Sequence, residues 1–263
     1  MLAAFIGASR GVGYHTVVQL LSSPSTQQWT AILLVRKPEA LSSDPNLAEY
    51  ISSGRLQLIK GDATVEDDIR QLFDRQVDLL VTSIGGKSQL TRRGFINDVP
   101  DLCTRATVAL LHVLAEVHKK GQQVPRVITV STMGVGENHK VMPLVWRILY
   151  PWLLRSALLD KGGLEYLFQR ASTVMSPPTP PSTDVLSATT ISSTLKDFIP
   201  EVIILRGAAY VEDDQPPKGR KETKIGERLK SYTIRRAEVA RVIVEDCLPG
   251  RNEWVNKLPV IGY

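Results

Sequence analysis

Cysteine is scarce in this chain of 263 residues, and its scarcity excludes several classes of protein. The two cysteines, Cys103 and Cys247, lie far apart, so the chain has neither a CxxC pair nor the His/Cys spacing of a metal site. An Asn-x-Ser/Thr glycosylation sequence is also absent. These absences predict a cytoplasmic protein in a reducing compartment, without a disulfide framework or a bound metal.

Long apolar runs are missing as well. The most membrane-like stretch, residues 141–159, is interrupted by two prolines and two arginines, which argues against a transmembrane segment. We interpret it as the apolar wall of a pocket, with a partner surface or a shallow membrane contact as alternatives. The first residues, MLAAFIG, follow no basic segment and lead into a glycine motif, so they predict a buried strand and not a signal peptide.

Positive charge is concentrated in one part of the chain. Residues 218–236 carry eight Lys or Arg and two Glu, a local charge of +6, which leaves the rest of a chain of net charge +5 near −1. That distribution is not typical of a nucleic-acid-binding surface. The basic segment is interpreted as a solvated loop and helix face, with a patch for an anionic ligand or partner as the alternative.

Short runs rich in Val, Ile and Leu alternate with helical patterns along the chain. This alternation predicts an α/β fold: a single Rossmann-like domain over residues 1–263, with a doubly wound parallel sheet and helices on both faces. The expected strands are residues 2–8, 30–36, 56–62, 77–85, 126–132 and 201–207. The expected helices are residues 12–23, 65–73, 98–121 and 235–248, the third of them with an aspartate cap at its start.

One segment departs from this alternation. Twelve of the 23 residues from 172 to 194 are Ser or Thr, and the stretch PPTPP lies among them. Such a composition predicts an extended or mobile insertion that forms a passive surface loop, or alternatively a lid over a substrate. We expect residues 206–236, after the last strand, to form the substrate side of the domain.

The stretch FIGASRGVG, residues 5–13, joins the first expected strand to the first expected helix. Glycines at positions 7, 11 and 13 permit a tight turn, close approach of the backbone to a diphosphate, and close packing of helix on sheet. The helix N-terminus then supplies free N–H groups to the phosphates. The cofactor-binding residues expected in this turn are Gly7, Ser9, Arg10, Gly11, Val12 and Gly13.

Residues after the next three strands indicate which dinucleotide is bound. Arg36 follows the second strand, where an NAD site usually has an acidic residue, and together with Arg10 it suits the 2′-phosphate of NADP(H). Asp62 is placed to meet the adenine edge or to cap the following helix, and the two roles are compatible. Ser83 and Gly85, after the fourth strand, would let the backbone pass close to the cofactor.

These residues resemble the short-chain dehydrogenase/reductase superfamily. The glycine spacing, GDA after the third strand and VITVST at the fifth carry the resemblance, and the later blocks are similar to the atypical, NmrA-like and biliverdin-reductase-B-like branch. The resemblance implies that Lys161 binds the nicotinamide ribose and that Thr132, beside Ser131, contacts a substrate carbonyl. The tyrosine that usually stands four residues before the lysine is absent, and Ala157 occupies its place.

Without that tyrosine, reduction needs another proton source. Candidates between the fifth strand and Lys161 are His139, Lys140 and Tyr150, and Tyr150 is the best of them because it lies among apolar residues. Solvent or the substrate itself is the alternative that the resemblance implies.

Three functions are therefore open. The first is an NADPH-dependent reductase of a mostly apolar or aromatic small-molecule carbonyl or conjugated substrate. The second is a redox-neutral isomerase or cyclase on the same fold, and the third a non-catalytic NADP(H)-sensing regulator. The sequence identifies neither the substrate nor the oligomeric state.

Overall fold

The computed structural model describes residues 1–86, 88–92, 94–211 and 215–263, except for the side chains of Ser88, Leu90, Ile96 and Tyr150. Eight strands form its central sheet, in the spatial order β10 (Lys224–Gly226), β12 (Val260–Gly262), β8 (Val202–Gly207), β7 (Arg126–Thr132), β4 (Leu79–Thr82), β1 (Leu2–Ile6), β2 (Thr30–Val35) and β3 (Leu56–Lys60). Neighbouring strands are parallel except for β10 and β12, which pair antiparallel.

The order of the strands reverses direction beside β1. From β1 the chain moves outward through β2 to β3 on one side, then returns to β4 and continues through β7 and β8 on the other. In such doubly wound sheets, ligands bind at the carboxyl ends of the strands near this reversal. The α/β Rossmann-like fold class predicted from the sequence is therefore confirmed.

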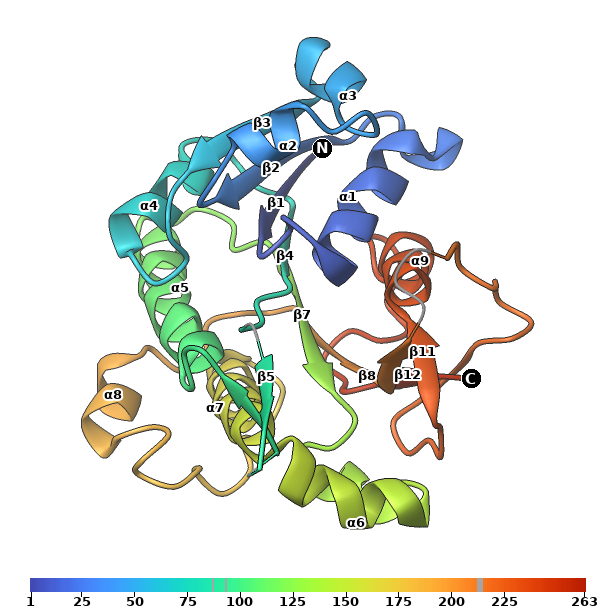
Figure 1. Ribbon diagram of the computed structural model, residues 1–263. Helices are drawn as coiled ribbons and strands as arrows, with labels where there is room; N and C mark the ends of the chain where they lie inside the picture. The colour runs from blue at the N-terminus through green and yellow to red at the C-terminus, as the bar shows by residue number, and fades with distance from the viewer. Residues whose placement is uncertain (87, 93, 212–214) are drawn as a thin grey trace.

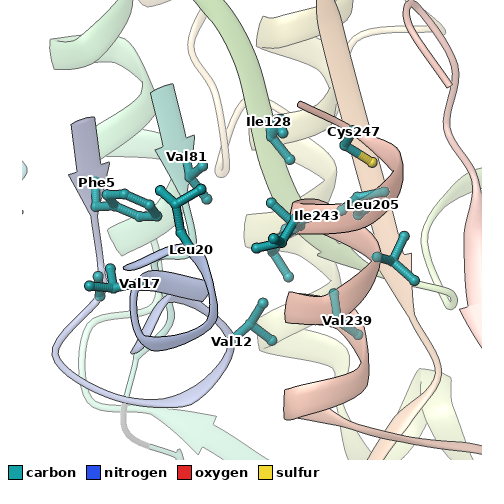
Figure 2. Close-up of a cluster of buried hydrophobic side chains, with 14 of the residues drawn as sticks. Phe5, Val12, Val17, Leu20, Val81, Ile128, Leu205, Val239, Ile243 and Cys247 are labelled. Carbon is teal, nitrogen blue, oxygen red and sulfur yellow. The ribbon is translucent and has the colours of Figure 1, made fainter. Parts of the chain in front are cut away.

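Helices cover both faces of the sheet (Figure 1). On one face lie α1 (Gly11–Ser22) and α9 (Arg236–Asp246), and on the other α4 (Glu66–Arg70), α5 (Leu102–Lys119) and α7 (Arg155–Ala171). Apolar side chains of α1 and α9 meet those of the strands in a closely packed cluster, shown in Figure 2 by Val17, Leu20, Val239, Ile243, Phe5, Val81, Ile128 and Leu205. The burial of both sheet faces explains why the strands read as near-continuous Val/Ile/Leu runs.

Several short elements complete the chain. They are η1 (Pro24–Thr26), α2 (Glu39–Ser42), α3 (Ala48–Ser52), η2 (Gln71–Phe73), η3 (Gly136–Val141), α6 (Leu144–Leu153) and α8 (Ala188–Ser193), the hairpin of β5 (Ser88–Thr91) and β6 (Gly94–Asn97), and the pair β9 (Ala209–Val211) and β11 (Thr233–Arg235). The β5–β6 hairpin, the strands β9 to β12 and the helix α6 were not expected from the sequence. The segment 172–194 contains the short helix α8. The Ser187 hydroxyl caps the start of α8 by accepting from the Thr190 N–H.

The start of α5 differs from the sequence-based expectation. The residue at its N-cap, Asp101, makes no side-chain cap hydrogen bond. Instead the buried carboxylate of Asp160, on α7, accepts from the backbone N–H groups of Cys103 at 2.9 Å and Thr104 at 2.8 Å. The cap therefore comes from another helix, and it ties α5 to α7.

Candidate functional site

A cleft of about 1060 Å³ opens at the carboxyl ends of the central strands. It includes the turns that follow β1, β2, β3 and β4, the end of β7, the start of α7, and two residues from the C-terminal part. Twelve of the site residues predicted from the sequence line it: Gly7, Ser9, Arg10, Gly11, Val12, Arg36, Asp62, Ser83, Gly85, Ser131, Thr132 and Lys161. Gly13 lies beneath the glycine turn and does not line the cleft.

The geometry of the turn after β1 explains why glycines are needed in it. Gly7 has a φ of +80°, and a Cβ there would lie 2.7 Å from the backbone carbonyl of Ser83, so no other residue fits between the ends of β1 and β4. Gly13 is buried under the turn, where a Cβ would lie 2.8 Å from the carbonyl oxygen of Gly7. Gly13 thus packs helix α1 against the turn and leaves the N-terminus of α1 facing the cleft.

Two exposed arginines and one carboxylate line the neighbouring part of the cleft. Arg10 belongs to the glycine turn and Arg36 follows β2, so their positive charges stand near the same edge. Asp62 follows β3, and its carboxylate accepts from both the N–H and the hydroxyl of Thr64. Partial burial alone would raise the pKa of Asp62, but these hydrogen bonds and the charge of Arg36 outweigh it and lower the pKa. The carboxylate therefore stays ionised and shapes the turn.

Lys161 is fixed at the inner part of the cleft by the sheet backbone. Its ammonium donates to the carbonyl oxygens of Ile84 at 2.8 Å and Val130 at 2.7 Å, at the ends of β4 and β7. An ammonium has three N–H donors, and these two carbonyls take two of them. The preceding residue, Asp160, holds the N-terminus of α5, and this contact sets the position of α7 from which Lys161 reaches the cleft.

Two hydroxyls from the end of β7 lie near this lysine. Ser131 is 2% exposed, lines the cleft, and its Oγ has no hydrogen-bond partner among the described residues. Thr132 is half-buried beside it. A buried hydroxyl without a partner is costly, so Ser131 is placed to hydrogen-bond a ligand in the cleft. Behind them, the buried pair Arg206 and Glu165 joins β8 to α7 by two hydrogen bonds of 3.0 and 2.5 Å.

The wall next to Lys161 is apolar. Leu102, Leu154, Ala157 and Leu158 line it, and Ala157 stands one helical turn before the lysine, where the usual tyrosine would be. Two of the alternative acids predicted from the sequence lie outside the cleft: His139 contacts the carbonyl oxygen of Arg147, and Lys140 pairs with Glu137. The side chain of Tyr150 lies outside the described residues.

The thiol nearest this wall is inert. Burial, reinforced by the charge of Asp160, raises the pKa of Cys103 to about 11, and its Sγ donates to the Ile84 carbonyl oxygen. A thiol of that pKa is not a nucleophile near neutral pH.

The sequence analysis did not single out Tyr210 and Arg236 as cleft residues, although both lie in the segment 206–236 that it assigned to the substrate side. Arg236 is the first residue of α9, and its side chain passes the glycine turn so closely that a Cβ at Gly11 would lie 3.3 Å from its Cδ. Its guanidinium stands over the ring of Tyr210, 4.6 Å from the ring centre. The Tyr210 hydroxyl is buried beside Gly207, so this tyrosine offers the cleft its ring and not its proton.

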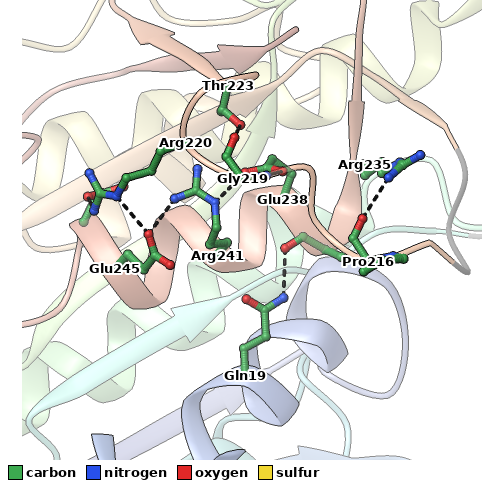
Figure 3. A network of polar contacts seen from close by, with 11 residues as sticks. Gln19, Pro216, Gly219, Arg220, Thr223, Arg235, Glu238, Arg241 and Glu245 are labelled. Atoms are coloured by element: carbon green, nitrogen blue, oxygen red, sulfur yellow. Dashed lines mark hydrogen bonds and ion pairs between the residues drawn. The ribbon is translucent and has the colours of Figure 1, made fainter. Parts of the chain in front are cut away.

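The basic segment 218–236 proves to be divided between two roles. Its first part is tied to α9: Arg220 pairs with Glu245, and the Gly219 N–H donates to Glu238 (Figure 3). Arg220 also pairs with Asp246. The last residue of the segment, Arg236, lines the cleft. Within this segment, therefore, Arg220 is paired with acids of α9 and Arg236 faces the site.

The chain matches the NAD(P)H-binding family over residues 7–190, from the glycine turn to α8. It belongs to this family. The resemblance to short-chain dehydrogenases/reductases and the prediction of a nicotinamide dinucleotide cofactor are thereby confirmed. The match covers the part of the chain that contributes most of the cleft.

Individual relatives of this NAD(P)H-binding protein are distant but span its length. Reductase pytE of Aspergillus terreus is 24% identical over 277 residues, 99% of this chain and 97% of the relative. A short-chain dehydrogenase/reductase from Veillonella parvula DSM 2008 superposes with a TM-score of 0.65 at 12% identity, covering 99% of this chain and 93% of that one. ChuY, an anaerobillin reductase from Escherichia coli O157:H7, does so with a TM-score of 0.62 at 17% identity, covering 100% and 97%.

The residues of the cleft fit a dinucleotide. The glycine turn leaves room that any Cβ at Gly7 would fill. The Ser131 hydroxyl, buried and without a hydrogen-bond partner among the described residues, lines the same cleft as the Lys161 ammonium. Within the described residues, no helix has both the length and the apolar composition needed to cross a bilayer.

Proposed function

We propose that the protein is an NADPH-dependent reductase of a mostly apolar carbonyl or conjugated small molecule, working without a tyrosine acid. The observation that carries this proposal is Lys161, whose ammonium is anchored to the Ile84 and Val130 carbonyls beside an apolar wall in which Ala157 replaces the tyrosine. An anchored cation suits a cofactor ribose, and an apolar wall suits a substrate that shares the cleft.

Each group of the cleft has a role in this proposal. The glycine turn and the N-terminus of α1 bind the diphosphate, and Arg10 and Arg36 bind a 2′-phosphate. Lys161 hydrogen-bonds the nicotinamide ribose, and Ser131 and Thr132 orient the substrate's polar atom. The cofactor, when bound, supplies a hydride.

The proton has to come from elsewhere in the site. Tyr210 keeps its hydroxyl beside Gly207, and Cys103 holds its proton too tightly to exchange it near neutral pH. We therefore assign proton delivery to solvent, or to the substrate itself, with Lys161 stabilising negative charge that develops on the substrate. This favours conjugated or otherwise activated substrates, whose reduced anions are stabilised internally, over simple ketones.

A redox-neutral isomerase or cyclase is the second candidate, and the same missing acid favours it. Such an enzyme would use the apolar wall to hold a substrate and the hydroxyls of Ser131 and Thr132 to polarise it. Oxidoreductase chemistry has the additional support of the reductase among the distant relatives. The sensor has least support, because a non-catalytic protein has no need for an apolar substrate wall beside Lys161.

The test has two steps. Calorimetric titration of the purified protein with NADPH and then NADH should give micromolar or tighter binding that prefers NADPH. Incubation with conjugated apolar carbonyl compounds should then consume NADPH, followed by absorbance, in a one-to-one ratio with product. Product without NADPH consumption would establish the redox-neutral enzyme, and binding without turnover of any compound would favour the sensor.

A further inference from the structure

The outer face of α6 is unusual for a protein surface. Ten large apolar side chains are exposed among the described residues, and six of these lie between positions 144 and 159: Leu144, Val145, Ile148, Leu149, Trp152 and Leu159. Exposed apolar residues are normal when scattered singly, but a contiguous group marks an interaction surface. Figure 1 shows α6 at the margin of the molecule, away from the central sheet.

The five exposed residues of α6 form one stripe. Leu144, Ile148 and Trp152 follow each other at intervals of four, and Val145 and Leu149 lie beside them at the same interval. Leu144 and Ile148 are 68% and 67% exposed, so this stripe does not belong to the core. Trp146 and Leu153 point to the opposite, inner side, where they are half-buried.

The charges on the segment that carries the stripe have one sign. Residues 141–159 contain no Asp or Glu, and their two charged residues, Arg147 and Arg155, are both exposed. Gly94, the first residue of β6, lies against the end of α6, since a Cβ there would be 2.5 Å from the Trp152 carbonyl oxygen; Arg92, two residues earlier in the chain, is also exposed. The nearest acid before α6, Glu137, is paired with Lys140.

An apolar stripe bordered by arginines and including a tryptophan is the pattern of a helix that lies in the surface of an anionic bilayer. A second copy of this chain would be a poorer occupant, because a two-fold contact through α6 would bring the arginines of both copies together. Ten residues make a helix about 15 Å long, half the thickness of a bilayer core, which suits lying on a membrane and not crossing it.

We propose that α6 is a membrane-contact helix, which docks this protein on an anionic lipid surface through its stripe of Leu144, Val145, Ile148, Leu149 and Trp152. The chain passes directly from α6 into α7, whose first turns present Leu154, Ala157 and Leu158 to the cleft. Docking therefore brings the apolar wall of the cleft next to the lipid. Delivery of a lipid-dissolved substrate is an extension that rests on the proposed reductase function; docking itself does not.

The experiment is vesicle flotation of the full chain. The protein should float with vesicles of phosphatidylcholine that contain about 30% phosphatidylserine. Binding should be severalfold weaker with vesicles of pure phosphatidylcholine, and also when about 0.5 M salt is added to the anionic vesicles. Ile148→Glu places a charge in the stripe and should weaken binding at least about tenfold. Val174→Glu is the matched control, because Val174 is also 67% exposed but lies in the segment 172–194, and it should bind like the unmodified protein.

A second readout places the helix directly. Brominated lipids should quench tryptophan fluorescence on binding, and Trp152→Phe should remove most of that quenching. Absence of binding to anionic vesicles would overturn the proposal, as would equal binding by Ile148→Glu. A concentration-dependent dimer that Ile148→Glu abolishes, without vesicle binding, would assign the stripe to a second copy instead. NADPH affinity, measured by calorimetry on the same variants, should be unchanged, which separates failure of docking from failure of the nucleotide site.

Discussion

The guanidinium of Arg236 stands 4.6 Å from the centre of the Tyr210 ring, and both side chains line the cleft. The two residues come from different elements, since Tyr210 belongs to β9 and Arg236 begins α9. A cation is attracted to the face of an aromatic ring, and this contact helps to keep Arg236 beside the glycine turn.

Replacing Arg236 by Ala should weaken NADPH and NADH binding alike, because its neighbour Gly11 belongs to the part of the cleft that both cofactors share. We expect a loss of about ten- to one-hundredfold, the range for a hydrogen bond to a charged group. Calorimetric titration measures it, with Arg235→Ala as the control, since Arg235 does not line the cleft. A loss confined to NADPH would instead assign Arg236 to the 2′-phosphate.

Replacing Arg36 by Ala, in contrast, should weaken the binding of NADPH but not that of NADH. Arg36 lies past the end of β2, where the adenosine ribose of a dinucleotide is bound, so NADPH binding should weaken by about 1.5–3 kcal/mol while NADH binding barely changes. The same titrations measure this. Equal losses for both cofactors would contradict the 2′-phosphate assignment.

The sequence was sufficient to predict what depends on local pattern. The glycine turn and the succession of strands and helices around it follow from neighbouring residues, because a strand, a turn and a helix must succeed each other there. Lys161 was predicted through its resemblance to a family motif, but its partners were not, since they are backbone carbonyls of Ile84 and Val130 that any residue type would supply. The Asp160 cap of α5 was missed for a related reason: it crosses from another helix.

Tyr210 and Arg236 were not singled out from the sequence because only tertiary packing brings them to the cleft. The contact requires α9 to pack beside α1, more than 200 residues earlier in the chain, and no local spacing encodes it. The available clue was the surplus of positive charge in residues 218–236, which the sequence alone could not divide between neutralised and site-facing arginines.

Replacing Lys161 by Met should abolish turnover on an identified substrate. The variant keeps a long side chain but loses two hydrogen bonds to carbonyl oxygens, so we also expect the free energy of unfolding to fall by about 1.5–3 kcal/mol. Steady-state kinetics and chemical denaturation measure the two effects. Lys140→Met is the control, because Lys140 is exposed and outside the cleft. Unchanged turnover would remove Lys161 from the mechanism.

The stability of α9, and with it the position of Arg236, should depend on pH through Glu238. This carboxylate is fully buried, and although burial alone would raise its pKa, hydrogen bonds from Thr223, Gly219 and Arg241 lower the pKa below its usual 4.5. A group whose pKa is lowered by folding stabilises the folded state above its unfolded pKa, and that contribution is lost as the pH falls through the folded value.

Glu238→Gln should therefore lower the free energy of unfolding by about 1–3 kcal/mol at pH 7. It should also make that free energy fall less steeply between about pH 5 and pH 3, because the variant has no proton to take up at this site. Denaturant titrations across this range measure both effects, and Glu253→Gln, at an exposed position, should leave the curve of the unmodified protein unchanged. Parallel curves for the Glu238 variant and the unmodified protein would show that Glu238 does not link stability to pH. A shallower curve together with weakened cofactor binding at pH 7 would show that the same carboxylate also keeps α9 in the position from which Arg236 reaches the cleft.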